Sequence, residues 1–436
     1  MNKILLPSRP HQEWADAEIG VIIHLDIEVF QPGYDLFDRT MAVPPAELFN
    51  PRRLDTDQWL ETAVAAGAKY AVLVAKHCTG FSLWPTAAHG YSVKAAPWRG
   101  GKGDIVADFM ASCAKYGVKP GLYASTGRNG LYKVFGNVQE FRPQAAEWLE
   151  YSAVVAAQLR ELWTRYGKLF EVWFDGGNLP AGHGGKEIAE TLAQLQPQAV
   201  VFQGDPELHH AVRWVGNELG QSPEICWSAA DSGTESDGMR NVLGGYPGSA
   251  AGRFWCPAEA DMPNRDCLRA WLGGWFWRGG EDHLAYRPED LVERYFKTVG
   301  RNSNLLLGMA IDDRGLVPDS DVRQYQEFGK LLKRQFSCCR EKRFGTGRTL
   351  YLDVADAAPV NCFSLQEDIS QGERALSFFL SGFDGQHYVP LANGHNIGHK
   401  RLVRLPECRY PSYRLEVPQA KDEPQIREFA AWHLPK

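Results

Sequence analysis

The 436-residue sequence lacks the motifs of several large classes of protein. It has no CxxC pair, and its nine cysteines are odd in number and irregular in spacing, which argues against a disulfide framework or a structural zinc site. It has no apolar run long enough to cross a membrane and no cluster of lysine and arginine. With 47 basic against 53 acidic residues, the chain is mildly acidic. We therefore expect neither nucleic acid nor a membrane as a partner.

The first residues and the cysteines bear on the cellular location. The opening segment, MNKILLP, has no long apolar core of the kind found in signal peptides. We expect most of the cysteines to be reduced and buried as small apolar residues. This favours a cytoplasmic location, or a periplasmic or secreted one if an export signal has been removed. The sequence gives no indication of the oligomeric state.

What the sequence does contain is an alternation of strand and helix patterns over its first three quarters. The predicted strands are residues 19–24, 70–76, 119–125, 170–175, 199–203, 213–215, 253–256 and 304–309. The predicted helices are residues 56–66, 104–116, 145–166 and 319–333, with Asp55 and Asp104 as caps at the starts of the first two. About eight strands alternating with helices indicate an α/β fold of the (β/α)8-barrel type. A doubly wound sheet is the alternative, but it requires a glycine-rich turn after the first strand, and His24-Leu25-Asp26 is not one.

The last hundred residues have a different pattern. Short alternating runs at 349–354, 362–365, 375–379, 402–405 and 413–417 are separated by Gly, Asp, Asn and Pro. They predict a small antiparallel β-sandwich. We therefore divide the chain into a catalytic barrel, residues 1–335, and a carboxyl-terminal β-sandwich domain, residues 336–436.

Polar residues stand at the carboxyl ends of several predicted strands, where the chemistry of a barrel enzyme is found. They are His24, Lys76 with His77, Tyr123, Asp175 and Glu259, and the segment RWVGNE at 213–218 adds Glu218. Each one alone is explained as a hydrogen-bonding residue at the rim of the barrel. All of them together are better explained by an active site.

Two of these carboxylates fit the requirements of glycoside hydrolysis, in which one carboxylate attacks the anomeric carbon and the other donates a proton. Asp175 ends an apolar strand beside Trp173 and precedes two glycines, so it suits the nucleophile, although an Asp here could also cap the next turn. Glu218, in a Gly- and Asn-containing loop, suits the proton donor, and Glu259 is its rival. The aromatic content, 12% with 14 Trp, suits carbohydrate rings as well as core packing.

Longer motifs give the chain a family resemblance. KHCTGFSLWP at residues 76–85 resembles the KHHDGFxLWPS segment of glycoside hydrolase family 29, the retaining α-L-fucosidases. Further segments of that family lie before and after it in the family's order: FNP at 49–51, KAAPW at 94–98, GDIV at 103–106, GLYAS at 121–125, VWFDG at 172–176 and VGRNSNLLL at 299–307. WVGNE at 214–218 and WCPAE at 255–259 resemble the subgroup specific for branched α-1,3/1,4 linkages. LQEDI at 365–369 and NIGHK at 396–400 resemble the family's sandwich, so the likeness covers nearly the whole chain.

The resemblance implies a retaining exo-α-L-glycosidase of the fucosidase type that acts through a covalent glycosyl-enzyme and needs no metal or organic cofactor. Its substrate would be an oligosaccharide or glycoconjugate that ends in α-L-fucose or a closely related α-L-sugar. Asp175 would be the nucleophile and Glu218 the acid/base. The residues expected to bind the substrate are His24, Asp26, Glu28, Thr40, Met41, His77, Cys78, Tyr123, Trp173, Arg213, Trp214 and Glu259.

The chain departs from the family pattern around the sugar. The family's HFG is His24-Leu25-Asp26 here, and Glu28 stands where Asn is usual. In the family's DREWG loop, Thr40 and Met41 replace the Glu and Trp. In the KHHDGF segment, Cys78 and Thr79 replace the second His and the Asp. In the family that Glu, Trp and second His contact the fucose hydroxyls at C3 and C4.

These departures leave the identity of the sugar open. One alternative is an enzyme for another α-L-sugar that differs at C3 or C4, such as an α-L-gluco sugar. Another is a carbohydrate-binding pseudoenzyme. The intact pair of Asp175 and Glu218 argues against the pseudoenzyme.

Overall fold

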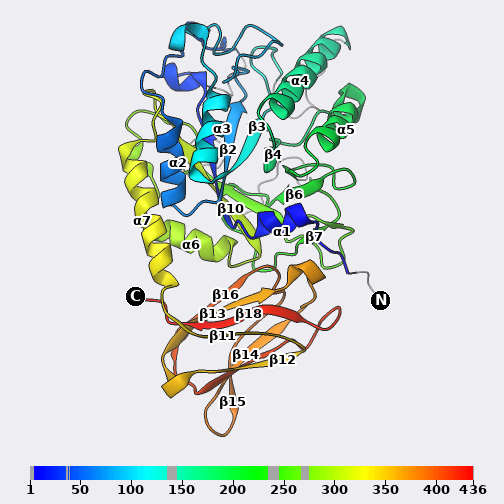
Figure 1. Ribbon diagram of the computed structural model, residues 1–436, viewed down its shortest axis with the longest axis vertical. Coiled ribbons are helices and arrows are strands. Elements are labelled where there is room, and N and C mark those ends of the chain that lie inside the picture. Colours follow the sequence, from blue (N-terminus) through cyan, green and yellow to red (C-terminus); the bar gives the residue numbers. More distant parts are fainter. Residues whose placement is uncertain are drawn as a thin grey trace.

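The computed structural model describes residues 4–35, 38, 40–134, 145–233, 245–266 and 274–435. Eight parallel strands close into a barrel in the order β1-β10-β9-β6-β5-β4-β3-β2. They are β1 (Ile19–His24), β2 (Tyr70–Lys76), β3 (Lys119–Ala124), β4 (Glu171–Trp173), β5 (Val200–Phe202), β6 (His210–Trp214), β9 (Ala258–Met262) and β10 (Ser303–Ala310). A β-sandwich lies below the barrel, and both chain termini lie near the junction of the two (Figure 1). The predicted fold class is confirmed.

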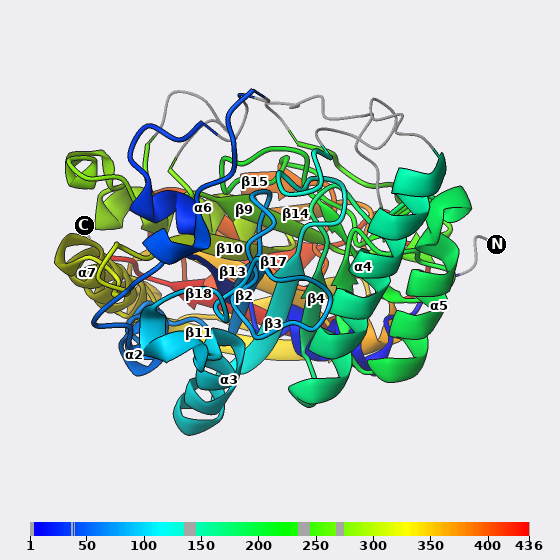
Figure 2. The same ribbon diagram turned by 90° about the horizontal axis from the view of Figure 1, so that it is seen from above.

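Helices cover the outside of the barrel, as the view from above shows (Figure 2). They are α2 (Thr56–Ala65), α3 (Ile105–Tyr116), α4 (Ala145–Arg165), α5 (Gly185–Leu195), α6 (Pro288–Thr298) and α7 (Asp319–Gln335). The first helix, α1 (Arg9–Ala15), differs, because its Trp14 packs among the side chains of the barrel interior. Asp55 caps α2 by accepting the backbone N–H groups of residues 57 and 58, and Asp104 caps α3 at residue 107. The barrel is irregular, because a short loop over residues 203–209 joins β5 to β6 without a helix. No helix among the described residues is long and apolar enough to cross a membrane.

The barrel strands are buried on both faces, as expected for parallel strands that are covered by helices. Every residue of β1, β2 and β10 is buried. Side chains that fill the barrel interior include Ile22, Tyr70, Val72, Tyr123, Trp173, Phe202 and Leu306. Two carboxylates, Glu171 and Glu259, are also fully buried there.

One predicted barrel strand was wrong. Within residues 253–256 the structure has a short strand, β8 (Phe254–Trp255), that pairs antiparallel with β7 (Ala229–Ala230) in a separate sheet. The next strand of the barrel is instead β9. The sequence is misleading here because β9, Ala-Glu-Ala-Asp-Met, has two acidic residues and follows Pro257, and yet all five of its residues are buried.

The sandwich consists of two four-stranded antiparallel sheets, β11-β18-β13-β16 and β12-β17-β14-β15. The strands are β11 (Cys339–Thr346), β12 (Thr349–Asp353), β13 (Val360–Glu367), β14 (Phe378–Phe383), β15 (Tyr388–Gly394), β16 (Arg401–Cys408), β17 (Ser412–Glu416) and β18 (Gln425–Trp432). Leu352, Phe363, Tyr413, Leu415 and Phe429 are fully buried in its core. Five of these eight strands were predicted from the sequence, and β11, β15 and β18 were not. β11 is largely exposed and charged, so it carries little of the expected apolar alternation.

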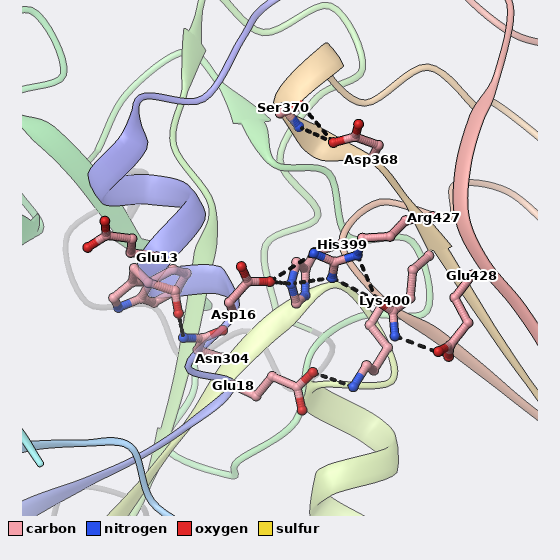
Figure 3. A network of polar contacts seen from close by, with 12 residues as sticks. Glu13, Asp16, Glu18, Asn304, Asp368, Ser370, His399, Lys400, Arg427 and Glu428 are labelled. Carbon is pink, nitrogen blue, oxygen red and sulfur yellow. Dashed lines mark hydrogen bonds and ion pairs between the residues drawn. The ribbon is translucent and has the colours of Figure 1, made fainter. Parts of the chain in front are cut away.

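A polar network joins the barrel to the sandwich (Figure 3). Asp16, which follows α1, accepts hydrogen bonds from His399 Nε2 at 2.8 Å and from Arg427 Nη1 at 3.0 Å. Glu18, which directly precedes β1, pairs with Lys400. Because these carboxylates lie before the first barrel strand, the sandwich is attached to the amino-terminal end of the barrel. The other end, where the predicted site residues lie, points away from it.

Candidate active site

Five of the predicted site residues meet at the carboxyl ends of β1 to β4. Tyr123, near the end of β3, donates a hydrogen bond from its hydroxyl to Asp175 Oδ2 at 3.0 Å. The ring of His77 stacks on that of Tyr123 at 5.7 Å, and the ring of His24 lies 6.0 Å from that of His77. Trp173, the last residue of β4, stacks on the other side of Tyr123 at 5.2 Å. These rings form a wall beside the Asp175 carboxylate.

The local backbone presents the Asp175 side chain. β4 ends at Trp173, and Gly176 and Gly177 follow Asp175 with φ angles of 77° and 87°, a region that L side chains rarely adopt. The N–H of Gly176 donates to Gln203 Oε1 at 2.7 Å, which fixes the turn. As a result Asp175 is exposed, whereas Tyr123 and Trp173 are buried. An exposed carboxylate beside a wall of packed aromatic rings is well placed to meet a sugar that lies against this wall.

Glu218 is connected to the same group through an aromatic residue. It lies in the loop after β6, two residues beyond Gly216, whose φ is 97°. The indole N–H of Trp275 donates to Glu218 Oε2 at 3.0 Å, and the ring of Trp275 lies 4.9 Å from that of His24. The structure therefore places Glu218 beside the wall that holds His24.

Burial keeps the polar groups of the wall uncharged. It lowers the pKa of His24 to about 3 and the pKa of His77 well below its usual value, so both imidazoles are neutral at physiological pH. His24 Nδ1 lies 3.3 Å from the carbonyl oxygen of Ile22, which assigns its proton to Nδ1 and leaves Nε2 as an acceptor. Burial, assisted by the charge of Asp175, raises the pKa of the Cys78 thiol to about 12.

Asp26 and Glu28 follow β1 and differ in their hydrogen bonds. Asp26 accepts the hydroxyl of Thr79, at 2.8 and 2.7 Å from its two oxygens, and the N–H of Ile27 at 2.6 Å. Glu28 Oε1 is buried without a hydrogen-bond partner among the described residues. Burial raises the pKa of Asp26 to about 7, and burial together with the charge of Asp26 raises that of Glu28 to about 8. Asp26 is thus occupied in holding the Thr79 segment, whereas Glu28 has an acceptor to offer.

Two sets of three side chains around His77 are close enough to hold a metal ion. In each set the potential ligand atoms lie within 4.8 Å of one another. One set is His77, Cys78 and Asp175, and the other is Asp26, Glu28 and His77. Both sets lie among the predicted sugar-binding residues. That the enzyme needs no metal or organic cofactor stays a prediction.

Two predicted substrate-binding residues have structural contacts instead. Arg213 is fully buried and donates to the carbonyl oxygens of Tyr246 at 2.7 Å and Trp227 at 3.1 Å, so it holds the chain that follows β6. Glu259 is fully buried as well, and it accepts the indole N–H of Trp173 at 2.9 Å. Because strand residues alternate in direction, a position near a strand end does not guarantee access to the substrate. The burial of Glu259 favours Glu218 as the proton donor.

Three further predicted residues, Thr40, Met41 and Trp214, have hydrogen bonds to residues outside the group around Asp175. Thr40 is exposed, and its hydroxyl donates to Asp38 at 2.6 Å, while Met41 Sδ accepts the N–H of Asp35 at 3.4 Å. Trp214 is half-buried and donates its indole N–H to Asp261 at 2.7 Å. No hydrogen bond in the described structure links Thr40 or Met41 to Asp175 or His77.

Two aromatic residues of the candidate site were not predicted from the sequence. Trp275 binds Glu218, and the ring of Phe276 lies 4.8 Å from that of His77 and 5.1 Å from that of His24. Their segment, GWFWRGG at 274–280, combines three aromatic residues with flanking glycines after the barrel strand β9. That combination was the available signal, because aromatic residues in a loop at a strand end are not explained by the core.

Comparison with known proteins identifies the family of the chain. Residues 5–336 match the family model described as alpha-L-fucosidase. A crystal structure of a putative alpha-L-fucosidase from Bacteroides thetaiotaomicron VPI-5482 superposes with a TM-score of 0.91 at 32% identity, covering 99% of this chain and 100% of that chain. Alpha-L-fucosidase 1 of Arabidopsis thaliana is 29% identical over 97% of this chain and 86% of its own length. A Ruminococcus gnavus fucosidase solved with fucose has the same fold, with a TM-score of 0.82 at 21% identity, covering 100% of this chain and 96% of that chain. The chain belongs to the alpha-L-fucosidase family, glycoside hydrolase family 29, and is an enzyme of the glycoside hydrolase class.

Proposed function

We propose that this enzyme is a retaining exo-α-L-glycosidase of the fucosidase type. The observation that carries the proposal is the exposed Asp175 carboxylate, which is oriented by the Tyr123 hydroxyl beside the stacked rings of His77, Tyr123 and Trp173. A pyranose that packs against these rings would present its anomeric carbon to Asp175. The relatives named as alpha-L-fucosidases, and the relative solved with fucose, support fucose or a closely related α-L-sugar as the glycone.

The reaction would proceed in two steps through Asp175 and Glu218. In the first step Glu218 donates a proton to the glycosidic oxygen while Asp175 attacks the anomeric carbon, which releases the aglycone and leaves a covalent glycosyl-enzyme. In the second step Glu218 takes a proton from water, and the water oxygen attacks the anomeric carbon and frees Asp175. Two inversions at one carbon give net retention.

The resemblance of residues 214–218 and 255–259 to the subgroup for branched linkages supports α-1,3 or α-1,4 bonds as the ones cleaved. The proposed substrates are therefore oligosaccharides or glycoconjugates that carry a terminal α-L-sugar on such a branch. We propose a cytoplasmic location for the enzyme, or an exported one if a signal has been removed.

Trapping of the intermediate tests the mechanism. An activated 2-deoxy-2-fluoro α-L-glycoside slows the second step, so the glycosyl-enzyme should accumulate, and mass spectrometry should find the label on the peptide that contains Asp175. Nuclear magnetic resonance of the first product formed should show the α-anomer. Release of the β-anomer, or a label on another carboxylate, would contradict the proposal.

A second candidate function concerns the glycone. The hydroxyl of Thr40 is bonded to Asp38, and Cys78 offers a neutral thiol, so neither replaces the strong hydrogen-bonding residues of the family at these positions. A buried hydroxyl left without a partner costs about 1–3 kcal/mol. Glu28 supplies a new buried acceptor near His77 and Asp26. These observations favour an α-L-sugar that differs from fucose at C3 or C4, or a fucoside with an added substituent.

A panel of aryl α-L-glycosides separates these possibilities. We expect weak turnover of the aryl α-L-fucoside and faster turnover of another α-L-glycoside. Cleavage of Lewis-type fucosides at the rate normal for the family would contradict the second candidate and leave the first intact. Binding of sugars without turnover of any member would indicate a pseudoenzyme.

A further inference from the structure

A carboxylate in the barrel interior is connected to the candidate active site through one aromatic side chain. Glu259, on β9, has none of its surface exposed. Its Oε1 accepts the indole N–H of Trp173 at 2.9 Å, and its Oε2 accepts the hydroxyl of Tyr70 at 2.6 Å. Both partners donate, so both oxygens of Glu259 act as acceptors.

Trp173 is held on its two faces and at its edge. Its ring stacks on Phe202 at 4.0 Å with an angle of 5° between the planes, and on Tyr123 at 5.2 Å. The two stacks fix the plane of the ring, and the hydrogen bond to Glu259 fixes the direction of the indole N–H within that plane. Tyr123, on the next strand, donates to Asp175. The contacts therefore run without a gap from Glu259 through Trp173 and Tyr123 to the carboxylate proposed as the nucleophile.

A second carboxyl group lies in the same buried layer. Glu171, on β4 two residues before Trp173, is also fully buried, and it lies beside Glu259 and Trp14. Burial and the charge of Glu259 raise its pKa well above the usual value, so Glu171 stays protonated at neutral pH. Two carboxyl groups at the centre of a barrel are costly where apolar side chains would fill the space. Their presence indicates a role other than stability.

We propose that Glu259 is a positioning residue for the reaction, one that fixes Trp173 in its plane and thereby sets the wall against which the sugar and Asp175 are aligned. It does not touch the substrate. The inference rests on the proposed role of Asp175. Glu259 would affect the rate by keeping Trp173 in its exact place, because a shift of about 1 Å in a positioning group can lower a rate about 100-fold.

A double-mutant cycle with Trp173 tests the proposal. Glu259→Leu removes the acceptor, and Trp173→Phe keeps an aromatic ring but removes the indole N–H. We expect each single variant to lower kcat on an activated aryl α-L-glycoside by about 10- to 100-fold. If Glu259 acts through Trp173, the double variant should be no slower than the slower single variant. Losses that multiply in the double variant would overturn the proposal.

Controls separate positioning from general damage. Glu259→Gln keeps an oxygen that can accept the Trp173 N–H, so it should restore most of the activity lost in Glu259→Leu. Glu373→Leu removes another buried carboxylate, which bonds Asn302 and Asn396 near the sandwich; it should lower the melting temperature without lowering kcat. If Glu259→Leu does not fold, the cycle is run with Glu259→Met, which also lacks a carboxyl oxygen, and losses that multiply with those of Trp173→Phe overturn the proposal. If the unaltered enzyme shows no turnover, or no label on Asp175, it is the proposed function that fails.

Discussion

Asp175 and the carboxylates around it show how exposure separates roles among chemically similar residues. Asp175 is exposed and bonded by a tyrosine hydroxyl, whereas Asp26 and Glu259 are buried and bonded to groups that they hold in place. Only the first can reach an anomeric carbon. The buried carboxylates of Asp26 and Glu259 instead hold residues that lie around Asp175.

The first prediction at this scale is for Asp175→Asn. The substitution keeps the volume and the hydrogen bond from Tyr123 but removes the nucleophile. We expect kcat on an aryl α-L-glycoside to fall by about a thousandfold or more, with an unchanged melting temperature. Asp353→Asn, in an exposed position of the sandwich strand β12, is the control and should retain full activity. Appreciable turnover by Asp175→Asn would rule out the assignment.

The second prediction is for Glu218→Ala, compared on two kinds of substrate. A natural glycoside needs a proton on its leaving oxygen, so its kcat/KM should fall by about 100-fold or more. An aryl glycoside with an acidic phenol as leaving group needs little protonation, so its first step should be nearly preserved. Equal losses of kcat/KM on both substrates would count against Glu218 as the acid.

The sequence predicts these residues unevenly, for a physical reason. Asp175, His24, His77 and Tyr123 follow from the rule that chemistry lies at the carboxyl ends of barrel strands. Arg213 and Glu259 stand equally close to strand ends, yet they face the interior or the supporting loops. Which way a side chain faces depends on the tilt and register of the closed barrel, and these are set by contacts between distant segments.

Among the secondary-structure elements, the helices with clear capping residues were predicted best. Asp104 begins α3, and Gly117 ends it with a φ of 68°. Both signals are local, so one sequence is enough to place them. The strand β9 was not predicted, because its buried Glu259 and Asp261 are tolerated only through partners elsewhere in the fold, Tyr70, Trp173 and Trp214.

The end of α3 gives the prediction for this scale. Gly117→Ala places a Cβ in open space, so the only penalty is the left-handed backbone conformation. We expect the free energy of unfolding to fall by about 1 kcal/mol, measured by urea denaturation. Gly182→Ala is the matched control, since Gly182 also has open space around its Cβ position but no positive φ. A loss of equal size in the control would mean that conformation is not the cause.

For the molecule as a whole, the attachment of the sandwich is the feature with the clearest energetic consequence. Glu18 and Lys400 form an ion pair across the junction, and both side chains are mostly buried. Burial alone would raise the pKa of Glu18, but the charges of Lys400 and His399 and the hydrogen bonds from Lys400 and Tyr295 together outweigh burial, and the pKa is lowered. The pair therefore contributes stability above the pKa of about 4.3 that Glu has in the unfolded chain, and this contribution is lost as the pH falls through the lower value in the folded protein.

Lys400→Met should destabilise the protein by leaving Glu18 buried without a cation. We expect the free energy of unfolding to fall by about 3 kcal/mol at pH 7. Below about pH 4.5 the decrease should be smaller, because Glu18 takes up a proton. Lys330→Met, on α7, breaks an exposed pair with Glu327 and should cost less than about 1 kcal/mol at either pH. Thermal denaturation followed by circular dichroism measures both. If the difference in stability between Lys400→Met and the unaltered protein does not become smaller at acidic pH, this account is contradicted.

The position of the polar junction also has a consequence for immobilising the enzyme on a solid support. The sandwich is fixed to the end of the barrel opposite the Asp175 carboxylate, and the chain termini lie at the level of the junction (Figure 1). A resin, a surface or a fused protein attached through the carboxyl terminus would therefore lie away from the end of the barrel that carries Asp175. Immobilised through the same end, many copies would all present the Asp175 end of the barrel outward.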